Sequence, residues 1–100
     1  MSPKYCKVDD NQKEIVEGLR KLGMTVQSLA TIGKGCPDIL VGYEGLNYLF
    51  EVKDGNKPMS GQKLTPDEVK WHEVWNGQID VINCLNDALI IIFKDNPPFN

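Results

Sequence analysis

Two apolar segments joined by a short glycine-containing connection constrain the fold of this chain most strongly. Residues 37–43 and 47–54 are rich in apolar, β-branched and aromatic side chains, and Glu44-Gly45-Leu46 lies between them. This spacing is typical of an antiparallel β-hairpin, because so short a connection cannot cross over to a parallel neighbour. We therefore expect a sheet built around this hairpin.

Polar side chains interrupt the hairpin at one end. Because side chains alternate along a strand, Glu51 and Lys53 share one face, whereas Phe50 and Val52 share the other, which we expect to face the core. Asp38 begins the neighbouring strand, and antiparallel pairing places the start of one strand beside the end of its partner. Two carboxylates and a lysine are therefore predicted to meet at this end of the hairpin.

This cluster allows two interpretations. Neighbouring carboxylates repel each other unless a cation lies between them, and Mg²⁺ is commonly held by one or two carboxylates together with water and phosphate oxygens. Such an ion could activate a water for phosphodiester hydrolysis, while Lys53 orients that water, helps to deprotonate it or neutralises developing charge. The alternative is a surface ion pair between Glu51 and Lys53, worth about 0–1 kcal/mol, with Asp38 as a turn residue.

The remaining segments predict a single domain of the α/β class over residues 1–100. We expect helices where capping residues precede an apolar stripe, strands where β-branched residues cluster, and a loop where Gly, Pro and Lys gather. Together with the hairpin, these elements predict a mixed four-stranded sheet flanked by helices, in the order αβββαβα. The expected ranges are a helix over 11–22, a strand over 24–32, a loop over 55–63, a helix from Thr65 to a stop at Gly77, a strand over 80–85, and a helix over 88–93 capped by Asn86-Asp87.

Composition excludes several classes of protein. The longest apolar run, 88–93, is too short for a bilayer, and the first ten residues lack a secretory segment, so we expect a cytoplasmic protein with no membrane partner. The cysteines Cys6, Cys36 and Cys84 contain no C-x-x-C pair and are expected to be free thiols. The net charge of −3 argues against nonspecific nucleic-acid binding, although carboxylates that hold a metal overstate the negative charge of an occupied site.

The sequence also resembles a known nuclease family. Gly35-Cys36-Pro37-Asp38, followed by Glu51-Val52-Lys53, resembles the PD-(D/E)-x-K nuclease signature. Over residues 10–93 the order of elements is similar to that of VRR-Nuc, the virus-type replication-repair nuclease family, in its small stand-alone phage and bacterial form. The resemblance implies a restriction-endonuclease-like fold and structure-selective hydrolysis of DNA, such as Holliday junctions, by a homodimer using Mg²⁺ or Mn²⁺. For a phage-encoded chain, it implies the host cell cytoplasm.

The resemblance assigns roles to particular residues. Asp38 and Glu51 are the implied metal ligands, the backbone carbonyl of Val52 is a further ligand, and Lys53 is the implied catalytic lysine. Glu14 matches the acidic residue of the first helix, which contacts the metal directly or through water. Glu14 also fits the closing position of a capping box, a purely structural role.

The sequence departs from the family pattern at Glu68. Relatives commonly carry Gln where this chain has Glu68. The charge of Glu68 could weaken DNA binding, or the residue could only complete a capping box with Thr65; we favour the cap.

The competing function for the whole protein is a noncatalytic nucleic-acid-binding or interaction module that retains the nuclease fold. The intact set of Asp38, Glu51 and Lys53 favours the enzyme.

Basic and aromatic residues around the hairpin are candidates for DNA contact. Lys34, Lys57 and Lys63 are predicted to contact phosphates without reading sequence, the alternative being solvated loop charge. Trp71 and Trp75 lie four residues apart on one helix face. Core packing is the favoured interpretation of this pair, and base stacking is the alternative.

Overall fold

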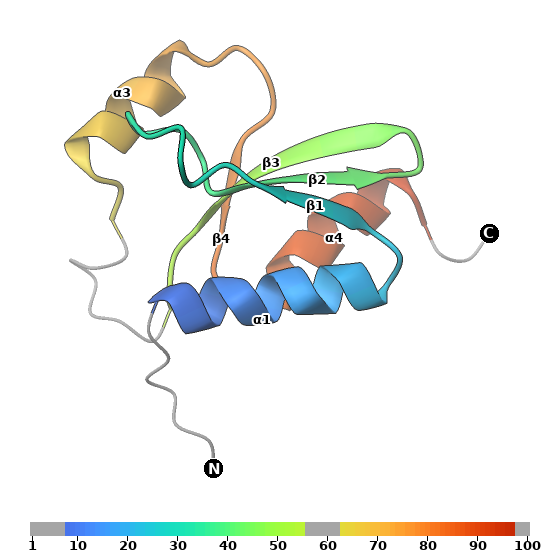
Figure 1. Cartoon of the computed structure of the whole chain (residues 1–100). Coiled ribbons are helices and arrows are strands. Elements are labelled where there is room, and N and C mark those ends of the chain that lie inside the picture. The colour runs from blue at the N-terminus through green and yellow to red at the C-terminus, as the bar shows by residue number, and fades with distance from the viewer. Residues whose placement is uncertain (1–7, 56–62, 98–100) are drawn as a thin grey trace.

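The protein folds into a mixed sheet with two helices on one face and a third helix at one end (Figure 1). The computed structural model describes residues 8–55 and 63–97. No helix in these ranges is both long enough and apolar enough to span a membrane. The elements are α1 (Val8–Lys21), β1 (Thr25–Ser28), β2 (Ile39–Tyr43), β3 (Leu46–Val52), α3 (Pro66–Val74), β4 (Asp80–Ile82) and α4 (Leu85–Asp95).

The strands lie in the order β1-β2-β3-β4. The first two pairs are antiparallel, and β4 joins β3 in parallel. Parallel neighbours need a crossover connection, and here the crossover contains α3. The expected α/β class and mixed four-stranded sheet flanked by helices are confirmed.

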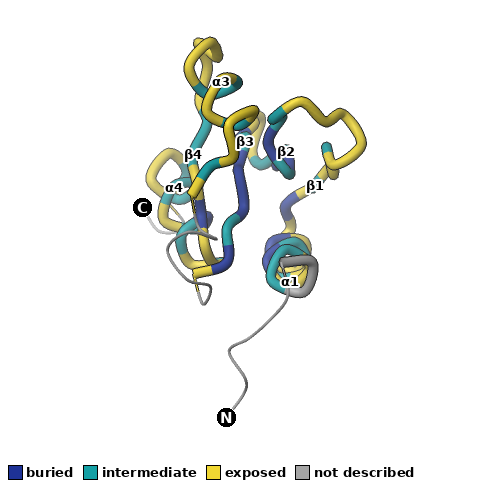
Figure 2. Tube along the Cα trace, turned by 90° about the vertical axis from the view of Figure 1, so that its left-hand side faces the viewer, coloured by how far each residue is buried: buried dark blue, intermediate teal, exposed yellow. Residues whose placement is uncertain are grey.

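The core lies between one face of the sheet and the helices α1 and α4 (Figure 2). Alternate residues of β2 and β3 are buried there, so the predicted placement of Phe50 and Val52 in the core is confirmed. The two helices approach closely at Gly18, where an added Cβ would overlap the side chain of Leu85. The buried apolar side chains are Ile15, Leu19, Met24, Ile39, Val41, Tyr48, Phe50, Val52, Ile82, Ala88 and Ile92.

The hairpin between β2 and β3 closes through a two-residue turn. Tyr43 pairs with Leu46, so Leu46 belongs to β3 and not to the connection. Glu44 and Gly45 have φ angles of 51° and 81°. Two successive positive φ angles define the turn whose twist matches that of paired strands, and glycine adopts this geometry without strain. The predicted hairpin is confirmed.

Other boundaries differ from the sequence expectations. The helix α1 begins at Val8 rather than at residue 11, so Asn11 and Glu14 lie inside it and do not form its capping box. The strands β1 and β4 are shorter than expected, and the loop over 55–63 lies mostly outside the described residues. The expected Asn cap of α4 is also wrong: the helix begins after Cys84, and the Asp87 carboxylate accepts the backbone N–H of Asn83 at 2.8 Å.

Candidate active site

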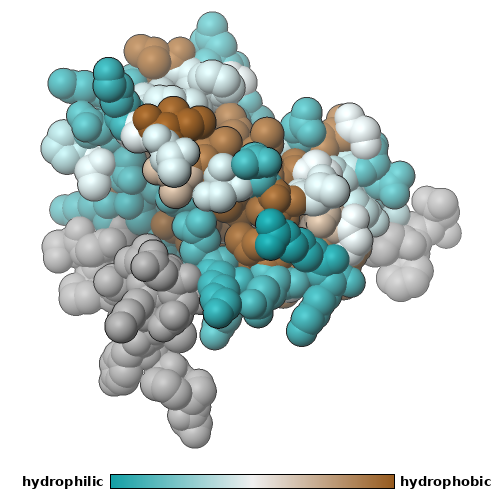
Figure 3. Space-filling model, in the orientation of Figure 1, coloured by the Kyte–Doolittle hydropathy of each residue, from teal (hydrophilic) through white to brown (hydrophobic). Residues whose placement is uncertain are grey.

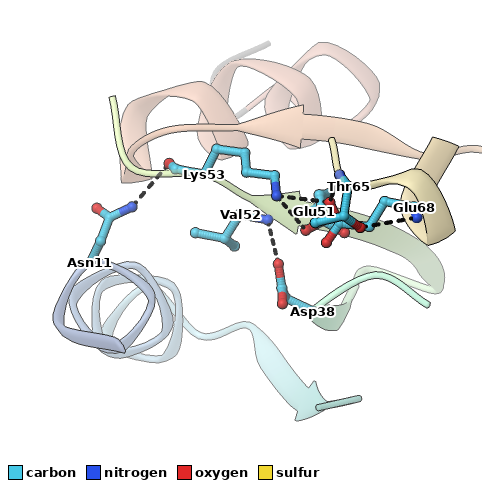
Figure 4. Close-up of polar contacts among 7 residues, drawn as sticks. All are labelled: Asn11, Asp38, Glu51, Val52, Lys53, Thr65 and Glu68. Carbon is cyan, nitrogen blue, oxygen red and sulfur yellow. Dashed lines mark hydrogen bonds and ion pairs between the residues drawn. The ribbon is translucent and has the colours of Figure 1, made fainter. Parts of the chain in front are cut away.

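Asp38 lies where the pairing of β2 with β3 becomes irregular. Its N–H donates to the Phe50 carbonyl at 3.1 Å, although the register partner of Phe50 is Ile39. Two residues therefore oppose one, the pattern of a β-bulge, which can re-aim a side chain at the end of a strand. The Asp38 carboxylate points toward β3, where its Oδ2 accepts the N–H of Val52 at 2.7 Å (Figure 4).

Glu51 is a buried carboxylate in an acidic neighbourhood. Its exposed fraction is only 2%, and burial, followed by the charges of Asp38 and Glu68, raises its pKa from 4.5 to about 9. Its Oε1 is buried without a hydrogen-bond partner among the described residues. A buried polar atom without a partner is costly in a folded protein, so this oxygen is suited to a ligand.

Lys53 lies between two carboxylates. Its Nζ donates to Oε1 of Glu68 at 2.8 Å and lies 3.6 Å from Oε2 of Glu51 (Figure 4). Burial by itself would lower the pKa of Lys53, but the hydrogen bond to Glu68 and the surrounding negative charges raise it overall. The side chain therefore remains an ammonium.

Glu68 belongs to this cluster as well as to the cap of α3. Thr65 Oγ1 accepts the Glu68 N–H at 3.2 Å, and Glu68 Oε1 accepts the Thr65 N–H at 2.8 Å, so the predicted capping box is confirmed. Burial favours a raised pKa for Glu68, but the contacts with Lys53 and Thr65 lower it overall. The contact with Lys53 was missed in the sequence, where only the departure from the family's Gln marked this position.

The residues at this end of the hairpin fit a small divalent cation. Among the described residues, no group of three or more His, Cys, Asp or Glu side chains is arranged to hold a metal. Two carboxylates, Asp38 and Glu51, are nevertheless brought together, and one Glu51 oxygen has no hydrogen-bond partner within residues 8–55 and 63–97. This donor set suits Mg²⁺ or Mn²⁺, because Mg²⁺ needs only one or two carboxylates and keeps several waters.

Glu14 forms no hydrogen bond or ion pair with the described residues of this cluster. Its side chain is exposed on α1 and makes no hydrogen bond or ion pair with another described residue. The α1 residue that reaches the site is Asn11, whose Nδ2 donates to the Lys53 carbonyl at 3.1 Å (Figure 4). The roles of Glu14 and of the Val52 carbonyl at a metal stay predictions.

Two of the three candidate DNA-binding lysines can be placed. Lys34 is exposed in the turn before β2, and Lys63 is exposed just ahead of the α3 cap. Gly35 connects these regions, because it packs so closely on α3 that an added Cβ would overlap the backbone of Asp67. Lys34 is therefore next to a residue that packs on the start of α3, and Lys63 precedes that helix closely in the chain. Lys57 lies outside the described residues.

The two tryptophans do not pack in the core. Trp71 and Trp75 stack with ring centroids 4.6 Å apart, but α3 contains no buried residue and Trp75 is 44% exposed. Apolar side chains reach the surface at the end of the molecule that carries α3 (Figure 3). The favoured core-packing interpretation is wrong, since helical spacing shows which side chains share a face but not what that face meets.

Comparison with known proteins supports the resemblance to a nuclease family. No family model matches the sequence, and the search of curated proteins found no match. A solved structure described as a VRR_NUC domain is similar to this chain, with 27% sequence identity and a TM-score of 0.63; the match covers 91% of this chain and 96% of the other. The motif around Asp38 and Glu51, the nuclease-like fold and this likeness together support a place for the chain in the VRR-Nuc nuclease family.

Proposed function

We propose that this protein is a metal-dependent endonuclease that hydrolyses phosphodiester bonds in branched DNA, such as Holliday junctions. One observation carries the proposal: the buried Glu51 lies in one cluster with Asp38 and Lys53, and its Oε1 has no hydrogen-bond partner in the described part of the chain. A noncatalytic module would gain nothing from this arrangement, because burying a carboxylate among other carboxylates is unfavourable.

In this proposal Asp38 and Glu51 hold Mg²⁺ or Mn²⁺, with the Val52 carbonyl as a further ligand and Glu14 acting directly or through water. When bound, the ion supplies positive charge to the phosphate and lowers the pKa of a water. Lys53 donates hydrogen bonds from its ammonium to a phosphate oxygen or to the attacking water. Burial lowers the pKa of Lys53, but the neighbouring carboxylates outweigh burial and raise this pKa overall. A raised pKa keeps the side chain protonated, which favours the donor role over that of a general base.

Lys34, Lys57 and Lys63 are proposed to contact the phosphates on either side of the cleaved bond. The chain as a whole is acidic, with a net charge of −3, so DNA binding must depend on the metal and on local basic residues. Contacts of this kind recognise backbone shape and not base sequence, which suits a branched substrate.

A cleavage assay tests the proposal. Wild type and Lys53→Ala would be incubated with a four-way junction, a flap and a linear duplex, with and without Mn²⁺. We expect Mn²⁺-dependent cleavage that falls by about 10²–10⁴-fold in Lys53→Ala. The matched control is Lys94→Ala, which removes an exposed lysine near the end of α4. Equal cleavage by wild type and Lys53→Ala on all three substrates would rule out the catalytic role, and binding without any cleavage would support the noncatalytic module.

We also propose a second copy of the chain as a partner. The helix α3 buries none of its own residues, and Val69, Val74 and Trp75 are exposed there. Contiguous apolar surface on a small domain is typical of an interface. A homodimer formed through α3 would bring two sites to two strands of a branched substrate.

A further inference from the structure

One oxygen atom of Glu68 joins the first turn of α3 to the cluster. Oε1 of Glu68 accepts the Thr65 N–H and the Lys53 ammonium, each at 2.8 Å. The same carboxylate therefore closes the helix cap and holds the lysine. Only 12% of the Lys53 side chain is exposed, so water is a poor substitute for this partner.

The same turn is held on its other side by the segment that leads to Asp38. Gly35 has a φ of +83°, and an added Cβ would overlap the backbone of Asp67 and crowd that of Glu68. Glycine is required here both for its conformation and for its lack of a side chain. The position of Glu68 is thus fixed by the cap and by the loop before β2.

We propose that Glu68 is a positioning residue for Lys53. The proposal rests on the proposed nuclease function and deepens it by making the first turn of α3 part of the active site. A lysine side chain has many rotamers, and a short charge-assisted hydrogen bond selects among them. Lys53 is 2.8 Å from Glu68 but 3.6 Å from Glu51. The ammonium thus pairs mainly with Glu68, and Oε1 of Glu51, which has no hydrogen-bond partner among the described residues, is left available to a cation.

The test compares Glu68→Ala and Glu68→Gln with a matched control on another helix. Asp87→Ala is that control, because Asp87 accepts a backbone N–H at 2.8 Å near the start of α4, as Glu68 does near the start of α3. Three properties would be measured in each variant: the melting temperature, the ¹H–¹⁵N NMR signal of the Lys53 ammonium, and kcat and KM for Mn²⁺-dependent DNA cleavage.

We expect Glu68→Ala and Asp87→Ala to lose similar stability, since each removes one helix-terminal hydrogen bond. Only Glu68→Ala should lose the protected Lys53 ammonium signal, and its kcat should fall about 10–100-fold with little change in KM, the range typical of residues that orient a catalytic group. Glu68→Gln retains an oxygen that accepts from Lys53 and should keep most of the activity.

Two results would overturn the proposal. One is a normal Lys53 signal and kcat in Glu68→Ala; the other is an equal loss of kcat in Glu68→Ala and Asp87→Ala, which would show a purely structural role. Failure of the nuclease assignment looks different. In that case no variant cleaves DNA, wild type included, while the NMR signal of Lys53 still depends on Glu68.

Discussion

Glu51 is a charged residue type that is buried almost completely in this fold. It lies on a strand whose alternate residues fill the core, yet its own carboxylate is buried on the opposite face. The cover there comes from α3 and from Asp38, both of which add negative charge. The unfavourable burial of Glu51 is therefore offset by Lys53 and, in the proposed function, by a bound cation.

This burial predicts how the stability of the metal-free protein depends on pH. Burial, with Asp38 and Glu68, raises the pKa of Glu51 from 4.5 to about 9, so the folded state binds a proton that the unfolded state releases across this interval. The free energy of unfolding should fall as pH rises through that window. The lowered pKa of Glu68 changes the free energy of unfolding only at pH values below this window, and the raised pKa of Lys53 changes it only at pH values above the window.

Thermal unfolding in the presence of EDTA would measure this effect. The melting temperature of wild type should decline toward alkaline pH, and that of Glu51→Gln, which cannot ionise at this position, should decline less. Adding Mg²⁺ should stabilise wild type most at the alkaline end, because the carboxylate is then free to bind it. Parallel curves for the two proteins would show that Glu51 ionises normally.

At the scale of elements, the turn between β2 and β3 carries a correctable strain. Glu44 has a φ of 51°, a conformation that costs about 1–2 kcal/mol for most L-residues and less for Asn. Glu44→Asn should therefore stabilise the protein, raising the melting temperature by several degrees. Calorimetry on this variant and on Glu44→Gln, which removes the charge without favouring the turn, would separate conformation from charge. A gain shared by both variants would point to charge.

Elements defined by neighbouring residues could be predicted from the sequence. The hairpin and the capping box of α3 each depend on a few adjacent residues, and both are confirmed. The start of α1 could not be predicted. Asn11 looks like a helix cap in the sequence, but its side chain donates instead to the carbonyl of Lys53, 42 residues away. The end of β1 also escaped prediction, since its side chains are mostly exposed and give no clear pattern.

The same distinction explains which part of the candidate site was predicted. Asp38, Glu51 and Lys53 meet because of hairpin pairing, which the short turn specifies. Glu68 reaches them through the crossover that contains α3, and nothing in the spacing of residues shows where that helix packs. Electrostatic partners across such a connection become visible only in the folded structure.

For the whole molecule, the distribution of charge predicts how DNA binding responds to salt. A chain with net charge −3 can bind DNA only through local positive groups, so affinity should weaken steeply as salt rises. Replacing Lys63 with Ala should weaken binding and reduce the slope of log Kd against log salt by about one, the value for one lost phosphate contact. Fluorescence anisotropy with a labelled junction would measure both. A slope unaffected by Lys63→Ala would remove this lysine from the binding surface.

The exposed face of α3 predicts the state of assembly. Val74 is 77% exposed on α3, and Ile90 is 61% exposed on α4, so either can be replaced without disturbing the core. If α3 forms the dimer interface, Val74→Lys should shift the protein to monomer, whereas Ile90→Lys should leave the dimer intact. Light scattering after gel filtration distinguishes these states. A wild-type monomer at micromolar concentration would exclude a stable homodimer.

The parallel pairing of β4 with β3 also suggests the order in which the chain folds. The β2–β3 turn closes over two residues within microseconds. In contrast, β4 can pair with β3 only after the long crossover that contains α3 has formed. Asp38 and Glu51 would then be neighbours in the nascent hairpin before Glu68 arrives to hold Lys53. Asp38 and Glu51 are thus brought together early and locally, whereas Lys53 is fixed by Glu68 only at the final, long-range stage of folding.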